Sequence, residues 1–210
     1  MAKNILITLE GNEGCGKSTQ IKLLYDFLKK QGKKIYLTCE PGGTRVGNAI
    51  RGILLDNKNE NLAPVAETLL YMASRAQLVE EIVLPHLKKG EIVLCDRWSD
   101  ATVAYQGFGG GIDVEWIKGL ADKATQGISP ALTLFLDLPL EIGLRRAVSH
   151  KEADRMEKKA ILFHKKVREG YEWIAKQEPD RFRRVSIAEE DSIEAVHERI
   201  KKEVLRVIEV

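Results

Sequence analysis

The stretch that most constrains this fold is EGNEGCGKST, residues 10–19, which directly follows the apolar run ILITL at residues 5–9. Residues 11–18 match the pattern G-x-x-x-x-G-K-S/T, whose glycines let backbone N–H groups turn inward around an anion. The helix expected after them adds its positive N-terminal dipole. Lys17 would then reach the β- and γ-phosphates of a nucleotide, and the Ser18 hydroxyl would hold Mg²⁺. The sequence therefore predicts a strand, a phosphate-binding loop and a helix in succession.

A glycine-rich turn with a surface lysine is the alternative that needs no ligand. The fixed positions match by chance on the order of once in a hundred chains of this length, and the flanking strand and helix further favour the phosphate loop. Of the two acids beside it, Glu13 is typical of an exposed loop acid, whereas Glu10 at the strand end favours a functional role. The predicted ATP-binding residues are Gly11, Asn12, Glu13, Gly14, Cys15, Gly16, Lys17, Ser18 and Thr19.

Short β-rich runs alternate with longer amphipathic runs along the chain. We predict strands at residues 4–9, 34–39, 91–95, 131–136 and 182–186. The helices we predict include 17–30, 44–55, 63–89 and 192–208, of which the third is bent or broken near Pro64 and ended by Gly90. This alternation is typical of a three-layer α/β fold, in which helices cover both faces of a five-stranded parallel sheet.

Chemically distinctive residues follow the first three predicted strands. EGNEGCGKS follows the first, EPGGT the second and DRW the third. Ligands of parallel sheets bind beyond the carboxyl ends of the strands, so these segments are expected to meet there. In this place Asp96 can reach Mg²⁺ directly or through water, and the Arg97 guanidinium can form paired hydrogen bonds to a second phosphate. A loop ion pair between these two residues is the alternative.

A further group of residues is suited to recognising a base. Tyr71 and Arg75 lie four apart, on one face of a predicted helix. Tyr71 and Tyr105 can flank a flat base, and the Gln106 amide offers both a donor and an acceptor. The simpler alternatives are core packing for Tyr71 and a surface pair with Glu67 or Glu80 for Arg75. Taken together, these residues favour a phosphate acceptor that carries a base.

Composition limits the remaining classes. The chain has 210 residues, which predicts one domain, residues 1–210, with at most a small mobile insert. Its net charge of +2 gives no reason to expect a nucleic acid or an anionic membrane as partner. No stretch approaches the roughly 20 apolar residues that span a bilayer, no signal peptide is recognisable, and the three cysteines lack CxxC spacing. We therefore expect a cytoplasmic protein.

At this point a specific resemblance appears. The segments LEGNEGCGKST, EPGGT, ETLLYMASRAQ, DRWSDATVAYQG, LFLDLPLEIGLRRA, DRME and FHKKVREGY occur in order over most of the chain. They resemble the thymidylate kinases of bacterial type, which are P-loop nucleoside monophosphate kinases that convert dTMP to dTDP with ATP. The resemblance implies transfer of the ATP γ-phosphoryl group with Mg²⁺ as cofactor, ATP and dTMP as small-molecule substrates, and a homodimer formed through helices beside the acceptor site. The apolar faces in residues 63–87 and 114–120 would allow such a dimer.

The resemblance also implies roles for individual residues. Glu10 would meet the sugar 3′-hydroxyl or the Mg²⁺ shell, Tyr71 would stack on thymine and Arg75 would bind its carbonyl. Arg97 would hold the acceptor phosphate, and Tyr105 would disfavour a ribose 2′-hydroxyl. The implied dTMP-binding set is Glu10, Tyr71, Arg75, Arg97, Thr102, Tyr105 and Gln106. The implied metal-binding pair is Ser18 and Asp96. The implied catalytic set is Lys17, Arg97, Glu10, Arg146 and Lys151.

A mobile lid is implied at about residues 148–155, with basic residues that cover the donor phosphates. The family commonly has Arg where this chain has His150, so the candidates for the lid's catalytic cation are Arg146, Lys151 and, least favoured, Arg155. Arg155 in DRME is equally typical of a structural pair with Asp154. Trp98 and Ala101 replace the family's more usual Tyr and Ser, which would reshape the acceptor pocket slightly.

Two other functions remain open at this stage. The first is a related nucleotide kinase that acts on dUMP, dCMP or a purine monophosphate. The second is a nucleotide switch or motor that hydrolyses NTP to change partners, because phosphate loops serve many functions. The chain has no N/T-K-x-D segment, and a switch would leave the Tyr–Arg and Asp–Arg stretches without a purpose.

Overall fold

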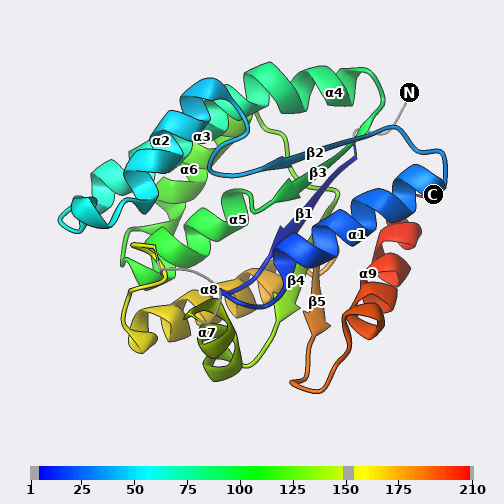
Figure 1. Cartoon of the computed structure of the whole chain (residues 1–210). Helices are drawn as coiled ribbons and strands as arrows, with labels where there is room; N and C mark the ends of the chain where they lie inside the picture. The colour runs from blue at the N-terminus through cyan, green and yellow to red at the C-terminus, as the bar shows by residue number, and fades with distance from the viewer. Residues whose placement is uncertain (1–4, 149–153, 209–210) are drawn as a thin grey trace.

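The centre of the molecule is a five-stranded sheet in which all neighbouring strands are parallel (Figure 1). The computed structural model describes residues 5–148 and 154–208, and the statements below concern those residues. The strand order is β2-β3-β1-β4-β5. The strands are β1 (Leu6–Glu10), β2 (Ile35–Cys39), β3 (Ile92–Asp96), β4 (Leu132–Asp137) and β5 (Phe182–Ser186). The predicted α/β fold and parallel sheet are confirmed.

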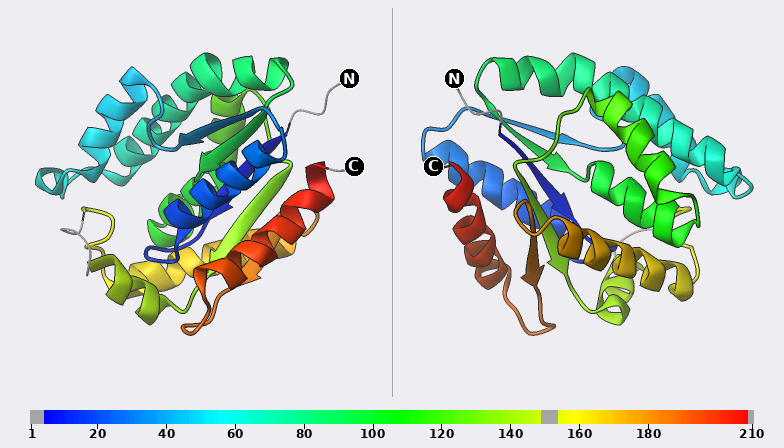
Figure 2. Two further views of the ribbon diagram at one scale, coloured as in Figure 1. Left: turned by 45° about the vertical axis from the view of Figure 1, so that its right-hand side comes forward. Right: turned by 180° about the vertical axis from the view of Figure 1, so that it is seen from behind.

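The helices form two layers on the faces of the sheet (Figure 2). On one face, α1 and α9 pack against the strands, with Leu24 and Ile200 in the same apolar cluster as Ile7 and Leu9. On the other face lie α3, α6, α8 and the turns joined to them. The helices are α1 (Lys17–Lys30), α2 (Arg45–Leu55), α3 (Pro64–Leu78), α4 (Leu84–Lys88), α5 (Ser99–Thr102), α6 (Val114–Thr125), α7 (Leu140–Val148), α8 (Ile161–Gln177) and α9 (Ile193–Ile208).

The structure divides residues 63–89 at a different point from the one predicted. Pro64 does not break it, because Pro64 is the first residue of α3, where a missing N–H costs no hydrogen bond. The change comes later, at the π-helical turn η2 (Val79–Val83) that leads into α4. Pro85 in α4 cannot donate to the carbonyl four residues earlier, and its ring crowds that carbonyl, which accounts for the wider turn before it.

A second π-helical turn, η3 (Val103–Gly109), continues α5 and carries Tyr105 and Gln106. A short 3₁₀ turn, η1 (Asn57–Asn59), follows α2. Within the described part of the chain, every helix is too short or too polar to cross a membrane. The sheet brings the ends of β1, β2 and β3 together, since Leu9 pairs with Asp96 and Asp96 pairs with Cys39. The three loops singled out in the sequence therefore lie at one edge.

Candidate active site

A cleft of about 730 Å³ lies at this edge of the sheet. Its walls come from the loops after β1, β2 and β3, from α3 and η3, and from the chain around Arg146 and Asp191. The predicted site residues that line it are Glu13, Gly14, Cys15, Gly16, Lys17, Ser18, Thr19, Tyr71, Arg75, Asp96, Arg97, Thr102, Tyr105, Gln106 and Arg146. The phosphate loop and the predicted base-binding residues thus share one cleft.

The phosphate loop is held by its own backbone conformation. Gly11, Gly14 and Gly16 have φ values of 142°, 69° and 92°, which residues with side chains rarely adopt. A Cβ on Gly14 would lie 1.9 Å from the Gly143 carbonyl oxygen, so this position accepts only glycine. The Lys17 ammonium lies inside the loop and donates to the carbonyl oxygens of Gly11, at 3.0 Å, and Asn12, at 2.8 Å. The loop therefore presents a fixed, concave backbone with a cation at its base.

The two residues predicted to hold the metal lie together. The Ser18 hydroxyl is 3.5 Å from Oδ2 of Asp96, and the other oxygen of this carboxylate, Oδ1, is buried without a hydrogen-bond partner. In the described residues, no group of three or more His, Cys, Asp or Glu side chains could hold a metal ion by itself. A hydroxyl and one carboxylate fit Mg²⁺, which keeps several waters and is completed by substrate phosphates.

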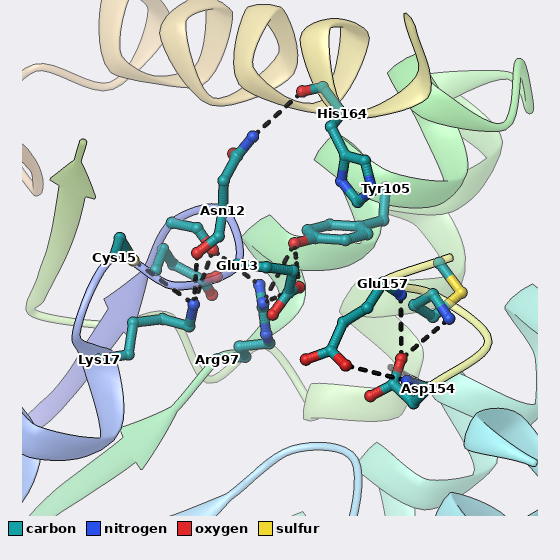
Figure 3. A network of polar contacts seen from close by, with 12 residues as sticks. Asn12, Glu13, Cys15, Lys17, Arg97, Tyr105, Asp154, Glu157 and His164 are labelled. Carbon is teal, nitrogen blue, oxygen red and sulfur yellow. Dashed lines mark hydrogen bonds and ion pairs between the residues drawn. The ribbon is translucent and has the colours of Figure 1, made fainter. Parts of the chain in front are cut away.

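Arg97 is the centre of a polar network between the loop and the rest of the cleft (Figure 3). Its Nη2 atom donates to Glu13 Oε1 at 2.7 Å and to the Tyr105 hydroxyl at 3.1 Å. Its Nη1 atom donates to the Gly11 carbonyl at 3.1 Å and to the Tyr171 hydroxyl at 3.2 Å. The expectation that Glu13 is an exposed loop acid was wrong, because its side chain is only 17% exposed and pairs with Arg97.

The pKa values of Glu10, the last residue of β1, and Glu13, in the phosphate loop, are shifted in opposite directions. Glu10 is fully buried, and its carboxyl accepts from the Trp98 backbone N–H at 2.7 Å and from the Tyr171 hydroxyl at 2.8 Å. Burial raises the pKa of Glu10 to about 8, although Arg97 opposes this shift. Burial also acts to raise the pKa of Glu13, but the charges of Arg97 and Lys17 outweigh it and lower the pKa to about 2. Glu10 lies beneath the cleft, and its contact with a sugar or metal shell stays a prediction.

The predicted base-binding residues converge from α3, α5 and η3. Arg75 is 1% exposed, pairs with Glu40 and donates to the Thr102 hydroxyl at 2.7 Å. Burial raises the pKa of Glu40, with the Arg75 charge opposing the shift. The alternative of a surface pair for Arg75 was wrong. Both acids considered for it bind other groups: Glu67 accepts from Gln106 and Arg155, and Glu80 accepts from Gln126.

Comparison with known proteins now decides the family. The sequence model of the thymidylate kinase family matches residues 9–200. The chain belongs to the thymidylate kinase family. It is 50% identical over 182 residues to a thymidylate kinase of Citrifermentans bemidjiense, covering 84% of this chain and 81% of that protein. It is 46% identical over 198 residues to one of Caldanaerobacter subterraneus, covering 94% and 93%.

A solved structure agrees. The crystal structure of thymidylate kinase from Ehrlichia chaffeensis has a TM-score of 0.77 to this chain at 32% identity, and the match covers 95% of this chain and 97% of the other. As a member of the thymidylate kinase family, the chain is an ATP-dependent nucleoside monophosphate kinase that phosphorylates dTMP.

Some residues of this cleft were missed as individual site residues. Glu40 and Pro41, joined by a cis peptide bond, lie in the EPGGT segment, whose position after a strand was the available signal. Arg51 also lines the cleft and donates to the Pro41 carbonyl at 2.7 Å. Nothing in the sequence around Arg51 distinguishes it from a surface arginine of a helix, so only the fold places it beside the site.

The lid residues divide into three cases. Arg146 lines the cleft and donates to the Glu189 carbonyl at 3.2 Å. His150 and Lys151 lie outside the described residues. Arg155 is 5% exposed and bound to the Leu54 carbonyl and Glu67, so it serves as a structural residue. Glu67 is thus a buried structural partner of Arg155, and the pairing of Arg155 with Asp154 stays a prediction.

Proposed function

We propose that the chain transfers the γ-phosphoryl group of ATP in line to the phosphate of dTMP, by positioning and charge rather than covalent chemistry. The observation that carries this proposal is the single cleft that joins the phosphate loop to a base-binding wall, with Arg97 between them. No general base is required, because the acceptor phosphate is already an anion near neutral pH. The donor phosphates lie on the loop, and the acceptor lies between Arg97 and α3.

The donor end uses the loop backbone and Lys17. The Lys17 ammonium lies within the loop and would exchange its contacts with the Gly11 and Asn12 carbonyls for the β- and γ-phosphates when ATP binds. Ser18 and Asp96 would hold Mg²⁺, which would supply neutralisation of the charge on these phosphates. Arg146 is the lid-side cation among the described residues that faces the cleft, and Lys151 stays the second candidate.

The acceptor end uses Arg97 for the phosphate and a polar wall for the base. Glu13 and Tyr105 hold Arg97 beside the proposed acceptor site, and Arg51, which also lines the cleft, can share the phosphate charge. Tyr71 stacks on thymine, Arg75 donates to a base carbonyl, and Thr102 and Gln106 complete the wall. Tyr105 limits the space beside the sugar 2′ position.

The wider organisation is also a proposal. Residues 1–210 form one kinase domain, with a lid at about residues 148–155 that closes over the donor. A homodimer is supported by exposed apolar side chains on α3 and α6, among them Val65, Leu69 and Trp116. A cytoplasmic location is supported by the sparse, unpaired pattern of cysteines, all three of which are free in the structure.

The test is ADP release from Mg·ATP with dTMP, dUMP, dCMP, dGMP and AMP as separate acceptors. We expect a strong preference for dTMP. Preference for another acceptor would keep the phosphate loop and remove the roles given to Arg75, Thr102, Tyr105 and Gln106. ADP release that ignores every acceptor would support a switch-type ATPase instead.

A further inference from the structure

Glu67 on α3 connects the base-binding wall to Arg155, the last residue of the proposed lid segment. Its side chain is 11% exposed, and its two oxygens face different partners. Oε1 accepts from Nε2 of Gln106 at 2.8 Å, and Oε2 accepts from Nη2 of Arg155 at 2.5 Å. Gln106 lines the cleft, whereas Glu67 lies behind it. The carboxylate is therefore positioned to act on a ligand only through Gln106.

The chemistry of the two groups decides how the Gln106 amide is oriented. A carboxylate has acceptors only, whereas an amide side chain has an oxygen acceptor at one end and an NH₂ donor at the other. Rotating the Gln106 amide by half a turn would place two acceptors against each other in a buried site, which is costly. Glu67 therefore holds the NH₂ end of Gln106 and leaves the amide oxygen as the end available to the cleft.

Arg155 fixes the carboxylate in turn. Its Nε atom donates to the Leu54 carbonyl at 2.8 Å, and its backbone N–H donates to the Leu55 carbonyl at 3.3 Å, so α2 fixes the position of its guanidinium. The guanidinium donates to Oε2 of Glu67, so the other oxygen, Oε1, accepts the hydrogen bond from Gln106. The network runs from the end of α2 through Arg155 and Glu67 to the cleft.

We propose that Glu67 is a positioning residue that sets base specificity, by fixing the Gln106 amide so that it presents an acceptor to the base. This inference rests on the proposed function, in which Gln106 faces the base. An acceptor suits pyrimidines that carry an N3–H, namely thymine and uracil. It disfavours cytosine, whose N3 is itself an acceptor. Glu67 thus selects for imide bases without touching the ligand.

The central test is the variant Glu67→Gln, assayed with dTMP, dUMP and dCMP. The new amide can donate as well as accept, so the Gln106 amide becomes free to turn its NH₂ end toward the base. We expect the ratio of kcat/KM for dTMP to that for dCMP to fall about tenfold or more, the worth of one or two mispaired hydrogen bonds. The ratio for dTMP to dUMP should not change, because both bases carry N3–H, and this ratio is the internal control.

Two companion variants separate positioning from folding. Arg155→Met keeps the Glu67 carboxylate, so both ratios should stay close to those of the original chain even if stability falls. The double variant Glu67→Gln with Arg155→Met removes the unpaired buried cation that the single change leaves, and it should reproduce the shift in the dTMP to dCMP ratio. Thermal unfolding of each variant, with and without dTMP, reports whether the fold is retained.

The outcomes distinguish this inference from the function on which it rests. If the original chain does not prefer dTMP over dCMP, the proposed base-binding wall is wrong. If it does, but the Glu67 variants lower kcat/KM for all three acceptors by the same factor, Glu67 is merely structural and the inference is overturned. An unchanged dTMP to dCMP ratio in the folded double variant overturns it equally.

Discussion

The donor and acceptor ends of the cleft are constructed in different ways. The main part of the donor end is one continuous segment, residues 11–18, whose shape comes from glycine φ angles and from hydrogen bonds within the loop. The acceptor end is assembled from separate elements and held by the buried pairs Arg75–Glu40 and Arg155–Glu67. Arg97 joins the ends through Gly11 and Tyr105. On the proposed function, the phosphate site is therefore a local motif, whereas the base site depends on the whole fold.

The largest effect is expected from removing the cation of the donor end. Lys17→Met should lower kcat about 10²–10³-fold, because a preorganised charge on the transferring phosphate is lost. The fall should be the same with dTMP and with dUMP, since Lys17 belongs to the donor end alone. Initial rates at saturating ATP and acceptor measure it, and Lys22→Met, an exposed lysine on the same helix α1, is the matched control. A fall that depends on the acceptor base would contradict the separation of the two ends.

A smaller and selective effect is expected at the acceptor end. Arg75→Gln should lower kcat/KM for dTMP about 10- to 100-fold, the worth of one charge-assisted hydrogen bond. The KM for ATP should stay unchanged, because the partners of Arg75, Glu40 and Thr102, belong to the proposed acceptor end and not to the phosphate loop.

Adding Glu40→Gln to that variant removes the buried acid that Arg75→Gln leaves unpaired, so it separates lost recognition from lost stability. Arg45, an exposed arginine at the start of α2 that is not among the residues lining the cleft, provides the control Arg45→Gln. A change in the KM for ATP as large as that for dTMP would show that Arg75 supports the entire cleft.

The same contrast explains what the sequence could predict. The phosphate loop was predictable because its chemistry lies within eight consecutive residues and requires glycine. The position of Asp96 and Arg97 in the cleft was predictable because parallel sheets place ligands beyond strand ends. The pairing of Glu13 with Arg97 was not, since 84 positions separate them and only the finished sheet brings them together.

The secondary structure shows a similar division. The five strands were predicted to within about two residues, because buried β-rich runs are bounded by glycines and turns. The π-helical turns η2 and η3 were missed, because a single shift of hydrogen bonding hardly alters the spacing of apolar residues. The turn η3 places Tyr105 and Gln106, so the feature that the sequence did not predict lies at the acceptor end.

The neighbouring residues Arg145 and Arg146 test whether Arg146 supplies a cation to the donor end of the cleft. Arg146 lines the cleft, whereas its neighbour Arg145 is 67% exposed and pairs with Glu189 at 2.6 Å. We expect Arg146→Ala to lower kcat about tenfold or more, through lost charge stabilisation. Arg145→Ala should leave kcat unchanged, since an exposed pair contributes little. Equal effects of the two changes, measured at saturating substrates, would remove Arg146 from the donor site and leave Lys151 as the candidate.

The smallest expected effect is on the pH dependence of the free energy of unfolding. It should differ between Glu10, beneath the cleft, and Glu13, in the phosphate loop. The folded-state pKa of Glu10, about 8, lies above its ordinary value of 4.5. Between these pH values only the unfolded state loses the proton, so the free energy of unfolding should fall as pH rises. The folded-state pKa of Glu13, about 2, lies below 4.5. Its contribution should be complete above pH 4.5 and be lost as pH falls toward 2.

Denaturant unfolding of the original chain, Glu10→Gln and Glu13→Gln across this range measures both contributions. From pH 6 to pH 7 the original chain should lose about 1 kcal/mol of stability relative to Glu10→Gln. Over the same interval its difference from Glu13→Gln should be constant, because Glu13 is ionised in both states there. A constant difference for Glu10→Gln as well would mean that Arg97 keeps Glu10 ionised in the fold. In that case the two acids would differ in position but not in charge.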